Sequence, residues 1–487
     1  MTDVCMQSAV AIAEMLRRRE VSAREVVSAH VARIEALDPV INAIVTRTFD
    51  TALARAAAAD DATASGREVG VLHGVPVAHK DLADTAGVRT TYGSPLFATN
   101  VPQRDALVVQ RMAQAGAISL GKTNVPEFGA GSHTVNAVFG ATRNPYHHGR
   151  SPGGSSGGAA AALAARLIAL ADGSDLGGSL RNPASFCNVV GLRPSPGRVP
   201  GWPFADVADT LGVAGPMGRT VADAALLLAV LAGPDPRVPL ALDQSPPVVT
   251  DPAQIRALLD RNLTGCRVAW SPDLGLPVEP EVLAVLAPAR QVLADLGCAV
   301  TDAAPDLSGA DEVFRTFRAF AFATFRADLV TGHPDLVGPN VTWNVRRGLE
   351  LTTADLSRAT VLRARLAEQI TAFFADVDVL ACPVSQVAPF DVTLDWVHEI
   401  NGQPMQTYLD WMASAYLISA TGLPAISVPA GFTTAGLPVG LQLVGRRRAD
   451  WDLLAVAHAF ESATGYAARA PESAPSLTAA TPPSSPA

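Results

Sequence analysis

Lys80 and Lys122 are the only two lysines among the 37 Lys and Arg residues of the chain. An arginine guanidinium keeps its proton at any working pH, whereas a lysine buried beside suitable neighbours can lose its proton and act as a base. Lys80 ends the apolar run 74–81, which predicts a buried strand that carries its last side chains into a loop, a common catalytic position. Lys80 is therefore the candidate base. A genomic bias toward arginine explains the ratio of the two residue types but not the positions of the lysines.

Two glycine-rich segments downstream each carry a central serine. Residues 151–158 read SPGGSSGG and precede an alanine-rich helical pattern, and residues 173–183 read GSDLGGSLRNP. Glycines at this density bring successive backbone N–H groups close to a ligand or to a developing negative charge. Two serines and a lysine that can be neutral supply a hydroxyl nucleophile, a hydroxyl relay and an amine base. This set is sufficient for acyl transfer without a histidine.

These motifs resemble those of the amidase signature family. The similarity rests on Lys80 within VPVAHKD, followed by GGSSGG and then DLGGSLRNP. It covers residues 74–198 and resumes at TGLPAISVPAG (421–431) and GLPVGLQ (436–442), so it frames nearly the whole chain. The resemblance implies one large α/β domain in which helices cover both faces of a mixed β-sheet. It also implies hydrolysis of carboxylic amides without a cofactor.

The resemblance further implies roles for individual residues. Ser179 would be the nucleophile that holds the acyl group. Ser155 would be the bridging serine, and Lys80 would be the base that accepts the proton of Ser179 by way of Ser155. In this family a cis peptide bond precedes the bridging serine, here between Gly154 and Ser155. Backbone N–H groups that point to the developing tetrahedral oxygen would form the oxyanion hole, at Leu176, Gly177, Gly178 and Ser179.

Residues around the nucleophile have expected supporting roles. Asp175 and Arg181 flank Ser179 and would brace its loop, and Ser174 keeps a hydroxyl where the family usually has threonine. The resemblance places the wall of the acyl pocket at residues 129–132, which are Gly129, Ala130, Gly131 and Ser132. Their small side chains predict a roomy wall, although the same composition is typical of a flexible loop.

Two further polar residues have a structural interpretation. On an alternating strand His79 would point away from Lys80, which favours a core histidine with satisfied hydrogen bonds. Lys122 lies in GKTN (121–124), a segment that fits the family without supplying the base. We therefore interpret Lys122 as a paired or capping residue.

A rival interpretation takes Ser155 as the nucleophile. Residues 153–157 match the Gly-x-Ser-x-Gly elbow of α/β-hydrolases, with His398 or His458 as the base. That elbow must follow an apolar strand, and residues 144–151 are instead polar and rich in turn-forming residues. The second serine motif would have no role in this interpretation.

Two other classes of function remain open. A phosphate-binding loop before the alanine-rich helix would require a lysine and a threonine after the glycines, and both are missing. A non-catalytic or transamidase-type assembly subunit is disfavoured by the complete set of Lys80, Ser155 and Ser179.

Composition and charge argue against several classes of protein. The net charge of −9 is the opposite of the positive charge that is typical of nucleic-acid-binding proteins. No apolar run is long enough to span a bilayer and residues 1–8 lack the pattern of an export signal, so we expect a cytoplasmic protein without membrane partners. The five cysteines are widely spaced and the histidines are scattered, so we expect free thiols and no metal site.

Hydrophobic periodicity outlines the elements. Residues 5–38 predict two amphipathic helices, with a capping box between Ser22 and Glu25 at the start of the second. Strand patterns alternate with alanine-rich helical patterns over residues 71–231, which indicates a layered α/β arrangement. The amphipathic helices could bury the surface of a homodimer.

The chain is expected to fold as one domain with four regions. A proline-rich connection at 234–252 leads to a second half that restarts at 266–270. The regions are N-terminal helices packed on the core (1–65), the signature core with the lysine and two serines (66–235), the second half of the same domain with variable substrate-entrance segments (236–470), and a disordered tail (471–487).

Aromatic side chains gather in residues 310–420, where we expect the substrate entrance. Five phenylalanines fall on a predicted helix and four further aromatics follow: Phe314, Phe317, Phe320, Phe322, Phe325, Trp343, Tyr408, Trp411 and Tyr416. Such a stripe is more often core than pocket. If part of it lines the entrance, hydrophobic or aromatic small-molecule amides are favoured, with esters, carbamates and anilides as alternatives because they share the tetrahedral chemistry.

Overall fold

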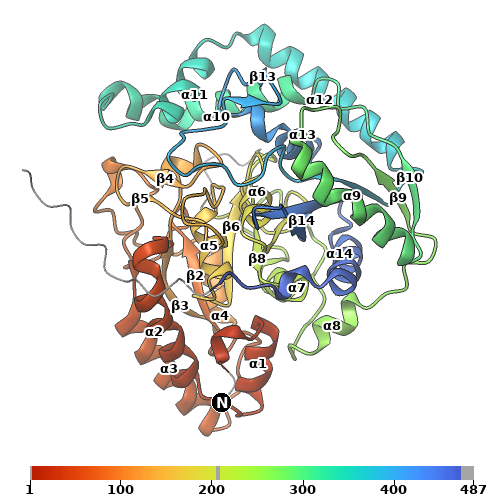
Figure 1. The fold of residues 1–487 in the computed structure, drawn as a ribbon. Helices are drawn as coiled ribbons and strands as arrows, with labels where there is room; N and C mark the ends of the chain where they lie inside the picture. The colour runs from red at the N-terminus through yellow and green to blue at the C-terminus, as the bar shows by residue number, and fades with distance from the viewer. Residues whose placement is uncertain (1–2, 204–208, 473–487) are drawn as a thin grey trace, which may run out of the picture.

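The centre of the structure is an eleven-stranded β-sheet, seen in the computed structural model, which describes residues 3–203 and 209–472 (Figure 1). The strands lie in the order β1 (Ile44–Arg47), β3 (Ile118–Thr123), β2 (Pro76–Lys80), β6 (Leu170–Asp175), β8 (Val213–Gly218), β7 (Val190–Arg193), β14 (Ala425–Phe432), β15 (Pro438–Gly445), β11 (Val379–Pro383), β9 (Arg267–Trp270) and β10 (Ala299–Asp302). Strand β2 is parallel to β3 and β6, whereas β6 is antiparallel to β8. The expected mixed sheet is confirmed.

Helices surround this sheet. In the described parts of the chain they are α1 (Ala9–Arg17), α2 (Ala23–Ile41), α3 (Phe49–Ala64), α4 (Leu107–Gln114), α5 (Gly157–Ala164), α6 (Arg181–Phe186), α7 (Val221–Leu231), α8 (Gln254–Leu259), α9 (Pro280–Asp295), α10 (Ala310–Gly332), α11 (Pro339–Leu349), α12 (Thr353–Phe373), α13 (Ala413–Thr421) and α14 (Asp450–Thr464). Figure 1 shows α10, α11 and α12 on the side of the sheet away from α1, α2 and α3.

Strands β14 and β15 show why both faces of the sheet must be covered. Ile426 and Val428 lie in a hydrophobic cluster with helices α7, α9 and α14, whereas Ala425 lies in a second cluster with α10, α12 and α13. On β15, Leu441 belongs to the first cluster and Val444 to the second. Successive side chains of a strand point to opposite faces, so a strand that is apolar throughout is buried on both.

Helices α1, α2 and α3 contribute buried side chains to the hydrophobic core. Ser22 accepts a hydrogen bond from the N–H of Glu25 and the carboxylate of Glu25 accepts one from the N–H of Ser22, so the predicted capping box is confirmed. Helix α2 extends to Ile41, three residues beyond the expected end, and α3 is a further helix.

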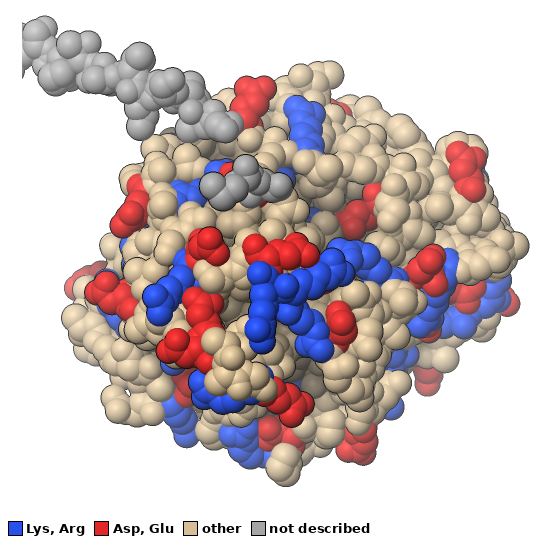
Figure 2. All heavy atoms as spheres, turned by 90° about the horizontal axis from the view of Figure 1, so that it is seen from below, with Lys and Arg blue, Asp and Glu red and all other residues tan. Residues whose placement is uncertain are grey.

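The outer face of these helices carries both signs of charge. The face seen from below in Figure 1 has basic and acidic side chains side by side (Figure 2). In the N-terminal region Arg24 pairs with Asp60 at 3.7 Å, and Glu14 pairs with Arg256 at 2.5 Å. The homodimer interface that we expect here stays a prediction.

The edge of the sheet where β2 and β6 end gathers the sequence motifs. Lys80 is the last residue of β2 and Asp175 is the last residue of β6. Because these strands are parallel neighbours, their carboxyl ends meet at one edge. Ser155 lies in the turn before α5, and Ser179 lies in the loop between β6 and α6.

The second half of the chain completes the same sheet. Its first strand is β9, and the five phenylalanines of the predicted helix lie on α10. Most of the expected tail, residues 473–487, lies outside the described residues. None of the helices in residues 3–203 and 209–472 combines the length and the apolar character needed to cross a membrane.

The capping box of α2 predicts a measurable contribution to stability. Ser22→Ala removes the acceptor for the N–H of Glu25 and is expected to lower the free energy of unfolding by about 1 kcal/mol. Ser28→Ala, on the exposed side of the same helix, is the control and should be neutral or slightly stabilising because alanine favours helix. The midpoints of guanidinium unfolding measure both, and equal midpoints would contradict a stabilising cap.

Candidate active site

Lys80 lies at the centre of a small hydrogen-bonded group. Its Nζ is 2.8 Å from Oγ of Ser155, 3.0 Å from Oγ of Ser174 and 3.3 Å from the carbonyl oxygen of Ser174. The side chain is buried, and all three partners are neutral oxygens. The structure thus brings together the lysine and one of the two serines that the sequence singled out.

Burial lowers the pKa of Lys80 to about 7, although the charges of Asp175 and Asp172 act in the opposite direction. Desolvation disfavours the ammonium form because low-dielectric surroundings stabilise charge poorly. A large fraction of Lys80 is therefore neutral at neutral pH. Such an amine can accept a proton from a hydroxyl group within hydrogen-bond distance.

Two hydroxyl groups of one neighbouring segment hold the turn that presents Ser155. The peptide bond between Gly154 and Ser155 is cis. The hydroxyl of Ser132 donates to the carbonyl of Gly154 at 2.7 Å, and the hydroxyl of Thr134 donates to the carbonyl of Gly153 at 2.8 Å. These bonds hold the Ser155 side chain toward Lys80.

Ser179 differs from Ser155 in its exposure. Ser155 is buried, whereas Ser179 is partly exposed, and both side chains border the same cavity. The carbonyl of Ser179 accepts a hydrogen bond from the N–H of Ser156 at 3.1 Å, which ties the two serine loops together. Ser179 is thus the more accessible of the two hydroxyl groups to a molecule in the cavity.

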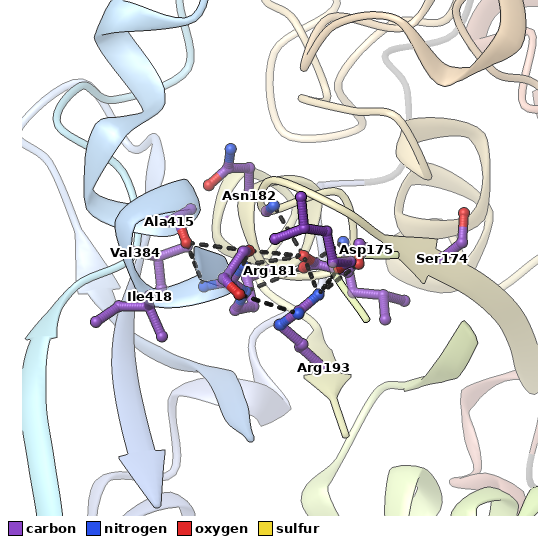
Figure 3. Close-up of polar contacts among 12 residues, drawn as sticks. Ser174, Asp175, Arg181, Asn182, Arg193, Val384, Ala415 and Ile418 are labelled. Atoms are coloured by element: carbon purple, nitrogen blue, oxygen red, sulfur yellow. Dashed lines mark hydrogen bonds and ion pairs between the residues drawn. The ribbon is translucent and has the colours of Figure 1, made fainter. Parts of the chain in front are cut away.

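The Ser179 loop folds around the carboxylate of Asp175. Arg181 binds it with Nε at 3.0 Å and Nη2 at 2.9 Å, and Arg193 approaches at 3.4 Å, as Figure 3 shows. Burial alone would raise the pKa of Asp175, but the two arginines and the N–H of Gly178 hold it well below its usual range. Asp175 and Arg181 therefore have contacts that suit the bracing role expected from the sequence.

The backbone of the same loop provides hydrogen-bond donors beside Ser179. The N–H of Gly178 donates to Asp175 at 2.9 Å, so in this structure it is not free for the expected oxyanion hole. The N–H groups of Leu176, Gly177 and Ser179 have no acceptor among the described residues. An aspartate three residues before the glycine is a local pattern that could have indicated this bond.

Gly178 itself is required by close packing. Its φ is +112°, and a Cβ at this position would lie 2.6 Å from Cβ of Ala415. A side chain here would push the loop away from α13. The position of Ser179 thus depends on a contact with a helix more than 200 residues away in the sequence.

A cavity of about 700 Å³ opens beside the two serines. Its apolar lining includes Leu82, Phe128, Leu176, Phe322 and Phe325, which come from four regions of the chain. Phe314, in contrast, stacks on Tyr416 with ring centroids 4.4 Å apart. The aromatic stripe of α10 is therefore divided between core and cavity, and Phe320 is exposed.

Residues 129–132 lie between this cavity and a second one. Gly129 borders the first cavity, and a Cβ there would lie 3.3 Å from Oγ of Ser155. Ala130, Gly131 and Ser132 line the second cavity, also of about 700 Å³, with Trp343, Tyr408 and Trp411. Only the first of the four predicted pocket residues thus borders the cavity that contains Ser179.

Comparison with known proteins agrees with this arrangement. The Amidase family model matches residues 25–454. The acylamidase of Rhodococcus erythropolis is 37% identical over 95% of this chain and 97% of its own length. The chain belongs to the amidase signature family. A glutamyl-tRNA(Gln) amidotransferase subunit of Synechococcus sp. (strain CC9605) is also 37% identical, over the same shares of the two chains.

Solved structures place this amidase among enzymes of the same fold. A bacterial aryl acylamidase of the amidase signature family matches with a TM-score of 0.87 and 30% identity, over 95% of this chain and 97% of that one. A 6-aminohexanoate cyclic dimer hydrolase matches with a TM-score of 0.84 and 31% identity, over 96% and 99%. The corresponding glutamyl-tRNA(Gln) amidotransferase subunit of Thermotoga maritima matches with 0.72 and 28%, over 95% and 96%. The chain is thus a hydrolase of amide C–N bonds.

The histidines of the rival elbow lie elsewhere in the amidase. His398 is exposed and its Nε2 is 2.8 Å from Asp395, and His458 lies 4.0 Å from Glu461. Neither borders the cavity that contains Ser155. Residues 144–150 form turns and isolated bridges, not the apolar strand that the elbow requires.

The two remaining polar residues are buried with partners. His79 lies 2.6 Å from Asp172, which matches the expected core histidine. Lys122 donates to the carbonyl of Ala83 and, at 2.8 Å, to the hydroxyl of Thr85, so it caps the loop that follows β2. No group of three or more potential metal ligands occurs in the described residues.

Sequence reasoning missed the arginines near the site. Arg193 adds a second cation beside Asp175, and Arg318 and Arg326 enter the cavity from α10. In a chain with so many arginines, these residues carry no local signal that separates them from surface residues. Their roles follow only from contacts between distant segments.

The ion cluster at Asp175 predicts a large loss of stability on its removal. Asp175→Asn leaves two buried guanidinium groups without a counter-charge and is expected to cost about 3–5 kcal/mol. Asp302→Asn breaks an exposed pair with Arg290 and should cost no more than about 1 kcal/mol. Guanidinium unfolding measures both, and similar losses would mean that Asp175 does not organise the loop.

Proposed function

We propose that this amidase hydrolyses small-molecule carboxylic amides through an acyl-enzyme on Ser179, with Ser155 as the bridging serine and Lys80 as the base. The observation that carries the proposal is the distance of 2.8 Å between Nζ of Lys80 and Oγ of Ser155, at the wall of a cavity that Ser179 also borders. A nucleophile, a relay and a base at hydrogen-bond distance are what acyl transfer requires.

The contacts of Lys80 suit an amine that has lost its proton. A neutral amine has two N–H donors and one lone pair. The two oxygens of Ser174, at 3.0 and 3.3 Å, can accept the two N–H bonds. The lone pair then faces the hydroxyl of Ser155 and can accept its proton.

The proposed reaction moves one proton along this chain of groups. Oγ of Ser179 attacks the amide carbon and gives its proton to Ser155, which gives its own to Lys80. Free N–H groups of Leu176 and Gly177 stabilise the oxygen of the tetrahedral intermediate. The proton returns to the leaving amine as the C–N bond breaks, and water then hydrolyses the ester on Ser179 by the same relay.

The cavity supports a preference for hydrophobic or aromatic amides. Phe128, Phe322, Phe325 and Leu176 offer an apolar surface beside Ser179, and aromatic rings stack well on such walls. Anilides, esters and carbamates fit the same chemistry because each passes through a tetrahedral intermediate.

A transamidase-type subunit is the second candidate. It is supported by the 37% identity to the Synechococcus amidotransferase subunit. The higher TM-score with the aryl acylamidase, 0.87 against 0.72, favours an independent hydrolase. The rates of ammonia release from glutamine and of aniline release from an acyl anilide separate the two candidates.

The base role of Lys80 predicts a pH dependence with a definite sign. Only the neutral amine is active, so kcat/KM should reach its maximum above about pH 7 and fall about tenfold per pH unit below that value.

Lys80→Arg keeps the charge but cannot give up its proton, and is expected to reduce acylation by about 10²–10⁴-fold. Thermal unfolding checks that the variant folds. Activity that survives in Lys80→Arg would exclude the relay.

The nucleophile can be identified with a serine-directed phosphonate, followed by intact mass and peptide mapping. We expect an adduct on Ser179 that is absent from Ser179→Ala and forms more slowly in Ser155→Ala. Ser156→Ala is the matched control, because this neighbouring hydroxyl is buried and has no hydrogen-bond partner among the described residues. An adduct on Ser155 would favour the elbow mechanism, and a folded protein without any adduct would favour a non-catalytic subunit.

A further inference from the structure

The cavity beside Ser179 is rich in basic side chains. Five arginines line it, namely Arg318, Arg326, Arg363, Arg447 and Arg448, against the two carboxylates Asp175 and Asp209. Asp175 is already paired with Arg181 and Arg193 behind the loop. In a chain with a net charge of −9, the positive charge is a property of the cavity and not of the composition.

Within the described parts of the chain, three of these five guanidinium groups have hydrogen-bond partners on other segments. Their contacts run from Arg318 to Asn344 and Tyr408, from Arg363 to Thr210, and from Arg447 to the carbonyl of Thr421. Arg447 and Arg448 are exposed at the rim of the cavity. These four arginines therefore connect elements of the cavity wall through hydrogen bonds or are exposed to solvent.

Arg326 is partly buried but has few hydrogen-bond partners among the described residues. Its Nη1 donates to the carbonyl of the preceding residue, Phe325, at 2.8 Å, and its Nε is buried without an acceptor among the described residues. Burial lowers the pKa of Arg326, and the nearby titratable group that opposes this shift is the phenol of Tyr92, not a carboxylate. A half-buried guanidinium without a counter-ion is unfavourable unless a ligand supplies one.

The position of Arg326 connects it to the catalytic serines. Its Cζ lies 4.7 Å from the centre of the Phe128 ring. The residue after Phe128 is Gly129, and a Cβ on that glycine would lie 3.3 Å from Oγ of Ser155. Arg326 thus faces the cavity one aromatic ring away from the backbone that borders Ser155.

The stack on Phe128 does not satisfy the hydrogen bonds of Arg326. The aromatic ring contacts the flat face of the guanidinium, whereas the N–H donors lie in its plane. The stack instead orients the plane. A fixed fork of N–H donors is suited to two parallel hydrogen bonds with a carboxylate.

We infer that the substrate is an amide that carries a carboxylate, and that Arg326 binds this carboxylate while the apolar part of the substrate lies along Phe128, Phe322 and Phe325. This inference rests on the proposed function. It adds an anionic group to the hydrophobic substrates that the sequence predicted, since the same cavity offers apolar walls and a cation without a counter-ion among the described residues.

Two matched pairs of anilides test the inference. The first pair has the carboxylate on the acyl side. It compares the para-nitroanilide half-amide of glutaric acid with an analogue in which isopropyl replaces the carboxylate. In the second it is on the amine side, as butyryl para-aminobenzoate against butyryl para-isopropylaniline. Wild type should favour one acid over its neutral partner by about 10–100-fold in kcat/KM, the range of a charge-assisted hydrogen bond.

Variants assign the preference to Arg326. Arg326→Met should reduce the ratio of kcat/KM for acid over neutral substrate at least tenfold, and Arg326→Lys should restore part of it. Arg290→Met removes an exposed arginine whose partner, Asp302, is also exposed, and should leave the ratio as in wild type. Equal rates for acid and neutral substrates in wild type, or a ratio that persists in Arg326→Met, would overturn the inference.

Binding to Ser179→Ala separates this inference from the proposed function. Titration calorimetry with the same pairs measures Kd without turnover. Tighter binding of an acid, lost when Arg326→Met is added to Ser179→Ala, would support the carboxylate site even if wild type hydrolyses none of the anilides, in which case the proposed function fails. Equal Kd values for acid and neutral partners would exclude the site even if both are hydrolysed.

Discussion

The buried carboxylate of Asp175 is the interaction on which the rest of the site depends. It ends β6 and binds Arg181 at the start of α6, Arg193 on β7, and the N–H groups of Gly178 and Leu180 in the loop itself. Arg181 also donates to the carbonyl of Ala415 on α13. A single charge thus fixes the loop that carries Ser179 to both halves of the chain, because Arg181 lies before the proline-rich connection and Ala415 lies after it.

The same arrangement explains why no carboxylate in residues 3–203 and 209–472 is a direct partner of Lys80. Asp175 is occupied by two arginines, and Asp172 lies against His79 at 2.6 Å. Both carboxylates still act on Lys80 through space, but its Nζ forms hydrogen bonds with hydroxyl and carbonyl oxygens of Ser155 and Ser174. An ion pair would stabilise the ammonium form of Lys80. Because both carboxylates are bound by other residues, burial can lower the pKa of Lys80.

Local sequence patterns predict a contact only when the two residues that form it are close in the sequence. The capping box of Ser22 and the end of the strand at Lys80 depend on residues close in sequence, so local patterns predicted them. The carbonyl of Ala130 accepts a hydrogen bond from Asn340 on α11, 210 residues later in the chain, and the local pattern of small residues contains no signal of this contact. Arg326 becomes distinctive only because it folds over Phe128, nearly two hundred residues earlier in the chain.

The two halves of the chain contribute different parts of the site. Lys80, Ser155 and Ser179 lie at the ends of buried strands and beside the buried helix α5, where close packing leaves little freedom. The opposite wall of the cavity comes from α10, a long helix that is only partly buried and lies in the region away from the N-terminal helices (Figure 1). Changes on the exposed turns of α10 can reshape the wall without moving Lys80 or the loop around Asp175. The amides that the cavity accepts can therefore change while the proposed relay stays in place.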